Sequence, residues 1–218
     1  MFTSSSVISI LNSFTTAPTE CCQLFKAMGS DKGLGWHNYT TLYHALFKEL
    51  RNTPVRFFEL GLGTHNTAIK SHMSEGNPGG SLRAWKQYFS HPDTQIYGAD
   101  IDRDILFQEP CISTYYVDQL DQQAITDMWN CIPGEMDVIL DDGLHTFDAN
   151  TCFLQNSIHK LKKGGLFIIE DLLLSSTFPS FEKILDEMKM KLGVSFIKLV
   201  NIPSAVNKYD NAVCLIVK

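Results

Sequence analysis

Short apolar runs alternate along the chain with segments whose apolar residues recur at helical spacing. The runs predict strands, and the segments with the helical period predict amphipathic helices. Strands are expected at 55–61, 94–100, 111–118, 135–142, 166–171, 194–200 and 211–218. Helices are expected at 39–50, 81–89, 121–130, 149–165 and 180–193, with Ser81 as the N-cap of the second and Gly164-Gly165 as the C-cap of the fourth.

This alternation predicts an α/β protein with a mostly parallel, seven-stranded sheet, helices on both faces and an antiparallel C-terminal strand. Residues 1–20 are rich in Ser and Thr and are expected to form an arm or a short helix, and 29–39 are expected to form a glycine-rich loop. We therefore divide the chain into an N-terminal arm and helix, residues 1–52, which cover the cleft, and a main domain, residues 53–218.

Acidic residues follow the strands of the expected sheet. In parallel sheets, ligands bind at the carboxyl ends of the strands. Five consecutive strands carry acids there, which predicts one acidic cleft; these acids are Glu59, Asp100, Asp118, Asp141, Asp142, Glu170 and Asp171.

The composition of the chain limits the kinds of binding partner that it favours. The 218 residues are 44% hydrophobic and carry a net charge of −6, which disfavours nucleic acid as a main partner. No apolar run is long enough to span a bilayer. No secretory signal is evident and the cysteines form no CxxC pair, so we expect a cytoplasmic protein with reduced thiols. Self-association into a homo-oligomer stays open.

The turn "ELGLGTHN" lets backbone approach a ligand through Gly61 and Gly63. A dinucleotide fingerprint would require a third glycine where Asn66 stands, and an acid much nearer than Asp100. A short turn followed by acids at the next two strand ends resembles class I S-adenosyl-L-methionine (SAM) methyltransferases. SAM carries a sulfonium charge and no phosphate, so an acidic cleft suits it.

The segment "DDGLHTFDAN" places Asp142 three residues before His145, and the next strand ends in Glu170 and Asp171. If the two strands are neighbours, these groups converge. Clustered carboxylates suit a hard cation such as Mg²⁺, which can acidify and orient an acceptor hydroxyl. A neutral histidine can then take the proton, so His145 is the candidate base.

Seven segments together resemble the metal-dependent sugar O-methyltransferases of macrolide and polysaccharide biosynthesis, the group around the macrocin and mycinamicin enzymes. They run in order across residues 29–172: "GSDKGLGWHNYTTLYHALF", "FFELGLGT", "GGSLRAWKQYF", "QIYGADID", "YYVDQLD", "VILDDGLH" and "GGLFIIEDL". The resemblance implies the Rossmann-like class I methyltransferase fold, SAM and a divalent cation as cofactors, and a sugar or related small polar molecule as acceptor.

The resemblance also implies roles for individual residues. It implies Asp142, Glu170 and Asp171 as Mg²⁺ ligands and His145 as general base. SAM contacts are implied at Lys32, His37, Glu59, Gly61, Gly63, Thr64, Ser81, Asp100, Ile101, Asp118, Gln119 and Asp141, with Asp100 at the ribose and Asp118 and Gln119 near the adenine.

One segment departs from the pattern, and three other functions stay open. Residues 65–78 intervene where plainer members of the family run directly from the glycine turn to the next helix. A catechol or phenol could also chelate Mg²⁺, but aromatic acceptors usually require an aromatic slot, and the sequence does not locate one. A non-catalytic SAM-binding subunit would not need His145, and a dehydrogenase is disfavoured by Asn66.

Overall fold

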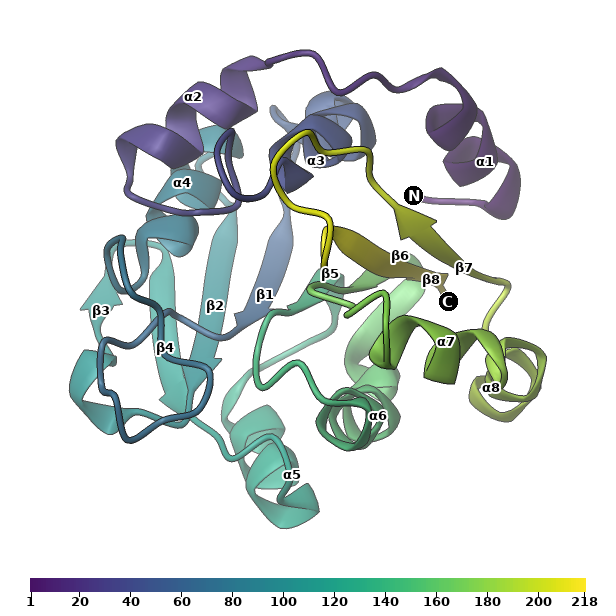
Figure 1. Ribbon diagram of the computed structural model, residues 1–218. Helices are drawn as coiled ribbons and strands as arrows, with labels where there is room; N and C mark the ends of the chain where they lie inside the picture. Colours follow the sequence, from purple (N-terminus) through teal and green to yellow (C-terminus); the bar gives the residue numbers. More distant parts are fainter.

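Eight strands form a single sheet in the order β3-β4-β2-β1-β5-β6-β8-β7 in the computed structural model, which describes residues 1–218 (Figure 1). The strands are β1 (Arg56–Leu60), β2 (Gln95–Asp100), β3 (Gln108–Glu109), β4 (Ile112–Tyr116), β5 (Met136–Asp141), β6 (Leu161–Ile169), β7 (Phe196–Asn201) and β8 (Ala212–Val217).

The strand directions confirm the predicted α/β class. Strands β4, β2, β1, β5 and β6 are parallel to one another. Strand β8 lies between β6 and β7 and is antiparallel to both, so the expected antiparallel C-terminal pair is confirmed. The predicted number of seven strands was wrong by one, because Gln108 and Glu109 pair with β4 as an additional two-residue strand that is too short to give a period.

Helices cover both faces of the sheet. They are α1 (Ser4–Ser13), α2 (Glu20–Ala27), α3 (Tyr39–Phe47), α4 (Gly80–Tyr88), α5 (Gln122–Cys131), α6 (Phe147–Ser157), α7 (Thr177–Glu182) and α8 (Leu185–Leu192), with 3₁₀ turns η1 (Lys48–Leu50), η2 (Arg103–Ile105) and η3 (Ile158–Lys160). Helices α1–α4 pack on one face and α5–α8 on the other. Because side chains alternate along a strand, Phe57 joins the first core and Phe58 the second.

Two predicted helix caps were wrong. Helix α4 begins after Gly79, whose φ is 70°, and Ser81 lies inside its first turn. Helix α6 ends at Ser157, and Gly164-Gly165 lies within β6. The pairing of β5 with β6 shifts between Met136 and Val138, and Gly164 has a φ of 73°, so these glycines form a bulge rather than a cap.

The single helix expected at 180–193 is two helices, since α7 ends at Glu182 and α8 begins at Leu185. Core positions Phe181 and Met188 keep the helical period across this break, so periodicity could not reveal it. The N-terminal segment forms helix α1, whose Val7 enters the first core. No helix is both long and apolar enough to cross a membrane.

Candidate active site

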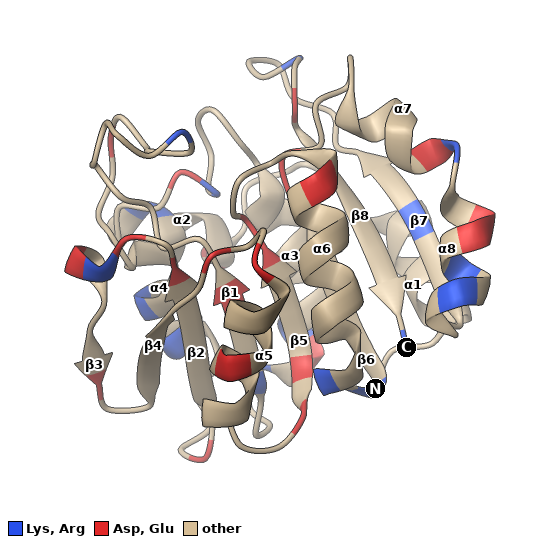
Figure 2. Cartoon of the chain, turned by 90° about the horizontal axis from the view of Figure 1, so that it is seen from below, with Lys and Arg blue, Asp and Glu red and all other residues tan.

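One pocket of about 380 Å³ lies at the carboxyl ends of β1, β2 and β5. Acidic residues stand where β1 and β2 end (Figure 2). Nine of the residues proposed from the sequence line this pocket: Gly61, Gly63, Thr64, Asp100, Ile101, Asp118, Gln119, Asp142 and His145. Its size and its mixture of apolar and polar walls are typical of a small-molecule site.

The turn after β1 requires glycines, because other parts of the chain pack closely against its backbone. Gly61 has a φ of 88°, and a Cβ there would collide with the carbonyl oxygen of Asp142. Gly63 has a φ of 78°, and its Cβ would lie 2.5 Å from the sulfur of Met73. Both positions therefore favour glycine on backbone and steric grounds.

The carboxylate of Asp100 lines the pocket and binds the backbone that follows β1 and β2. It accepts hydrogen bonds from the backbone N–H of Leu62 at 2.7 Å and of Asp102 at 2.8 Å. Burial raises the pKa of Asp100, and these two N–H groups act against the rise. Asp102, which the sequence reasoning missed, accepts a hydrogen bond from the hydroxyl of Thr64. Asp118 accepts from the N–H of Leu120 at 2.9 Å.

Asp141 is fully buried and does not line the pocket. It accepts hydrogen bonds from Gln119 Nε2 at 2.8 Å and Asn150 Nδ2 at 3.0 Å. Gln119 in turn accepts from the N–H of Leu144 at 2.8 Å. Asp141 therefore holds Gln119 in the pocket wall, and burial raises its own pKa to about 6.

A buried lysine lies among three carboxylates beside the pocket. Lys32 is 3% exposed, and its ammonium contacts Asp142, lies 2.5 Å from Glu170 Oε2 and lies 3.6 Å from Glu59 Oε1. Glu59 also accepts a hydrogen bond from Trp85 Nε1 at 2.7 Å, and Glu170 accepts one from the Tyr43 hydroxyl. This lysine offsets part of the negative charge that the sequence predicts for the cleft.

Burial sets the protonation of these acids. Burial raises the pKa of Glu59 to about 7, with Lys32 opposing the rise. The pKa of Glu170 is raised well above its ordinary value by burial, against the attraction of Lys32. For Asp142, burial also favours the neutral form, but Lys32 and His145 together outweigh it and lower the pKa.

Asp142, His145 and Asp171 form one group whose ligand atoms all lie within 4.8 Å of one another. His145 Nε2 is 3.8 Å from Asp171 Oδ2. His145 and Asp171 have φ values of 58° and 53°, and only one other non-glycine residue, Cys111, has a positive φ. Such backbone is costly and is concentrated at functional sites.

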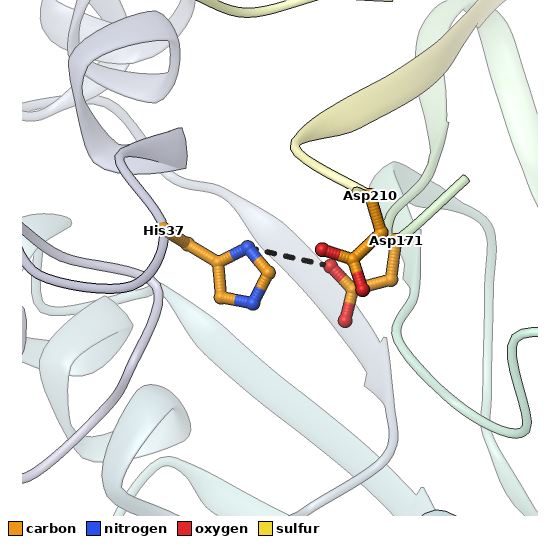
Figure 3. Close-up of side chains that lie close together, drawn as sticks. All are labelled: His37, Asp171 and Asp210. Atoms are coloured by element: carbon orange, nitrogen blue, oxygen red, sulfur yellow. Dashed lines mark ion pairs between the residues drawn. The ribbon is translucent and has the colours of Figure 1, made fainter. Parts of the chain in front are cut away.

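Asp171 also belongs to a second group. Its Oδ1 lies 3.6 Å from His37 Nδ1, and Asp210 completes the set within 4.8 Å (Figure 3). The Tyr39 hydroxyl donates to Asp171 Oδ1 at 2.6 Å. Burial raises the pKa of Asp171, with His145 and His37 opposing the rise. Asp210 was missed from the sequence because it lies in the loop between β7 and β8 and not at the end of a strand of the parallel sheet.

The structure brings together most, but not all, of the residues proposed from the sequence. Glu170 turns toward Lys32 and Tyr43 and lies outside both groups of ligand atoms. Ser81 and Lys32 line a smaller cavity with Asp142. The 65–78 segment forms part of the main pocket wall through Ala68, Ile69, Lys70, Ser71 and Met73.

The first group suits a divalent cation. It offers two carboxylates and a histidine, and hard cations prefer oxygen ligands. Glu59, Asp142, Glu170 and Asp171 crowd one region in which Lys32 is the cation in contact with three of them. His145 Nδ1 is buried without a hydrogen-bond partner. The donor set therefore fits Mg²⁺ or a similar ion.

Comparison with solved structures agrees with this fold. The chain is similar to the MycE methyltransferase of the mycinamycin biosynthetic pathway in complex with Mg and SAH, with a TM-score of 0.70 and 24% identity over 93% of this chain and 55% of that one. A complex of MycE with Mg, SAH and mycinamycin VI gives a TM-score of 0.67 at 25% identity, covering 93% of this chain and 55% of that one. The fold is that of a class I SAM-dependent methyltransferase.

Sequence relatives define the family more narrowly. The chain is 33% identical over 170 residues to 8-demethyl-8-alpha-L-rhamnosyl tetracenomycin-C 2'-O-methyltransferase of Streptomyces olivaceus, covering 78% of this chain and 42% of the relative. It is 33% identical over 176 residues to demethylmacrocin O-methyltransferase of Streptomyces fradiae, covering 79% and 41%. No protein-family model matches. The chain belongs to the macrocin/mycinamicin-type sugar O-methyltransferase family and spans less than half the length of these relatives.

Proposed function

We propose that the protein is an O-methyltransferase that transfers the methyl group of SAM to a hydroxyl of a sugar or related small polar acceptor, in natural-product or polysaccharide biosynthesis. The observation that carries this proposal is that Asp142 and His145 line the same pocket as Asp100 and Asp118. A cofactor held by Asp100 and Asp118 would thus present its reactive end to Asp142 and His145. The tetracenomycin and macrocin relatives named above support a sugar as acceptor.

SAM, when bound, supplies the methyl group on its sulfonium. Asp100 ends β2 and would receive the ribose hydroxyls, and Asp118 and Gln119 would lie at the adenine. Glu59 Oε1 is buried without a hydrogen-bond partner and lies beyond hydrogen-bonding distance of Lys32, so it can accept from an additional donor near the glycine turn. We place the SAM amino group on this side of the site.

A divalent cation, when bound, supplies charge that acidifies and orients an acceptor hydroxyl. Asp142, His145 and Asp171 would surround it, and Glu170 would join only if its carboxylate left Lys32. His145 would take the proton of the acceptor on Nε2, and Asp171, 3.8 Å away, would then stabilise the imidazolium. If His145 also bound the ion, it could not serve as base at the same nitrogen, so the two roles compete.

We propose in addition that residues 1–52 cover the site. Three side chains from this region support the proposal, because Lys32 contacts Asp142 and Glu170 while His37 and Tyr39 approach Asp171. These contacts join sequence-distant segments around the carboxylates. Residues 1–52 also share the core of the first sheet face through Val7, and we treat them as a cover built onto the domain.

The test has two stages. Calorimetry should first show that the protein binds SAH and not NAD. Turnover of SAM should then be followed by mass spectrometry with a panel of glycosides, in Mg²⁺ and in EDTA. We expect methylated glycoside in Mg²⁺, loss of product in EDTA and recovery when Mg²⁺ is restored.

Each failure has its own meaning. Full activity in EDTA would contradict the metal-assisted proposal while leaving methyl transfer intact. Tight SAH binding with no methylated product from any acceptor would favour the non-catalytic subunit. Methylation of catechols in preference to every glycoside would replace the sugar with a phenol as acceptor.

A further inference from the structure

Two exposed aromatic rings lie beside the second group of ligand atoms. Trp36 is 47% exposed and Tyr209 is 65% exposed, although large apolar side chains are usually buried. Their ring centroids are 6.2 Å apart at an interplanar angle of 19°, so the two rings are stacked. They come from segments 173 residues apart in the chain, the loop before α3 and the loop between β7 and β8, which Figure 1 shows side by side.

Two side chains, those of His37 and Asp171, lie between the Trp36 ring and the candidate base His145. The Trp36 ring centroid lies 6.4 Å from that of His37, whose Nδ1 lies 3.6 Å from Asp171 Oδ1. The other oxygen of Asp171 lies 3.8 Å from His145 Nε2. Asp210, the neighbour of Tyr209, is in the same group as His37 and Asp171 (Figure 3).

A network of buried polar contacts holds the two loops together. Asn207 Nδ2 lies 3.3 Å from His37 Nδ1, and Asn211 Nδ2 donates to Asn38 Oδ1 at 2.7 Å. The Tyr39 hydroxyl oxygen also lies 2.8 Å from the carbonyl oxygen of Asp210, and the His37 ring stacks on that of Tyr39. The two loops are therefore held against each other by the neighbours of Trp36 and Tyr209, while both rings remain exposed.

Further apolar side chains are exposed on these two loops and on a third segment, which follows β6. Leu34 precedes Trp36, Val206 precedes Tyr209, and Leu173 follows Asp171, each at least 37% exposed. The N–H of Leu174 donates to the carbonyl oxygen of Tyr209 at 2.8 Å, which ties the third segment to the second. Exposed apolar side chains gathered beside a polar site mark a binding surface.

We infer that Trp36 and Tyr209 form a stacking surface for the apolar part of the acceptor, an inference that rests on the proposed function. An aglycone against these rings places the attached sugar at Asp171 and His145. The acceptor is then a glycoside with an aromatic or otherwise apolar aglycone, because a free sugar at Asp171 and His145 has no further part to cover the rings, and a polysaccharide chain covers them with less apolar surface than such an aglycone. Aromatic rings supply large contact area at a small cost in conformational entropy.

The test compares matched acceptors on matched variants. The acceptors are aryl glycosides, each paired with the methyl glycoside of the same sugar. We expect Trp36→Ala and Tyr209→Ala each to raise KM for the aryl glycoside about tenfold, with kcat changed less than about twofold. KM for the methyl glycoside should stay within about twofold, and Trp36→Phe should recover part of the affinity. Met190→Ala removes an apolar side chain that is 78% exposed on α8 and serves as the control.

The SAH dissociation constant, measured on every variant, reports whether the fold is intact. Wild-type protein that methylates aryl and methyl glycosides with equal KM would overturn the stacking surface and leave the proposed function standing. Unchanged KM in both alanine variants would do the same. Absence of transfer to every acceptor would overturn both proposals. A shift from dimer to monomer on Trp36→Ala in size-exclusion chromatography, with unchanged KM, would assign the surface to a second copy of the chain instead.

Discussion

Lys32 Nζ lies 2.5 Å from Glu170 Oε2, although 138 residues separate the two in the chain, and both side chains are buried. The same ammonium contacts Asp142 and lies 3.6 Å from Glu59. A cation at this point lets three strand ends keep acids close together without a bound ion. The ammonium of Lys32 thus neutralises part of the negative charge around the candidate metal group.

Lys32→Met should destabilise the metal-free protein by about 3–5 kcal/mol, because the substitution leaves buried acids without their cation. Urea unfolding in EDTA measures this loss. Mg²⁺ should restore more stability to the variant than to the wild type, since the ion would meet uncompensated carboxylates. The control is Lys48→Met, at an exposed lysine. Equal stability of Lys32→Met and wild type in EDTA would show that the acids do not depend on the ammonium.

Glu59 should make the stability of the cofactor-free protein depend on pH. Its folded pKa is raised to about 7, above the ordinary 4.5, so the folded state binds a proton in this window that the unfolded state does not. Stability from this group therefore increases as pH falls from about 7 to 4.5, by up to about 3 kcal/mol.

Urea unfolding of wild type and Glu59→Gln at pH 7.5, 6.5 and 5.5 checks the sign. The difference in unfolding free energy between the two proteins should change steadily across this series, because glutamine does not titrate. A difference that stays constant with pH would show that Glu59 is ionised throughout, as a partner of Lys32.

His145→Asn should lower kcat about 10²–10⁴-fold, the usual contribution of a general base. Asparagine is chosen because it tolerates left-handed backbone, and His145 has a φ of 58°. SAH affinity should stay within about threefold. The comparison variant is His91→Asn, outside the pocket, which should keep full activity. A His145→Asn enzyme with wild-type kcat would remove the residue from the proton transfer.

Gly61→Ala and Gly63→Ala should differ in whether a second change can rescue them. A Cβ at Gly61 meets backbone, the Asp142 carbonyl, which cannot move aside, whereas at Gly63 it meets the flexible side chain of Met73. Both substitutions strain the backbone, and we expect Gly61→Ala to cost on the order of 3 kcal/mol.

Met73→Ala should recover part of the stability lost in Gly63→Ala and none of that lost in Gly61→Ala. Urea unfolding of the two double variants measures the recovery, and Met73→Ala alone supplies the reference. Equal recovery in both backgrounds would contradict the contacts that distinguish the two glycines.

The chain order of apolar runs and helical periods was enough to predict the α/β class, the parallel sheet and the acids at its carboxyl edge. These features depend on local pattern: parallel strands point the same way, so residues that end them, such as Asp100 and Asp142, meet at one edge. The glycine turn and the Asp142–His145 spacing are local in the same sense.

Contacts between distant segments had to be read from the tertiary structure. Periodicity assigns no partner to Lys32, and Glu170 and Asp171, adjacent at one strand end, face different neighbours: Lys32 for the first, and His37, His145 and Asp210 for the second. Trp36 and Tyr209 are also distant in the chain, and they stack only because of the strand order. Strand β8 inserts between β6 and β7, which brings the β7–β8 loop beside the loop before α3. Sequence spacing encodes which side chains share an element, whereas packing of one element on another decides which of them meet.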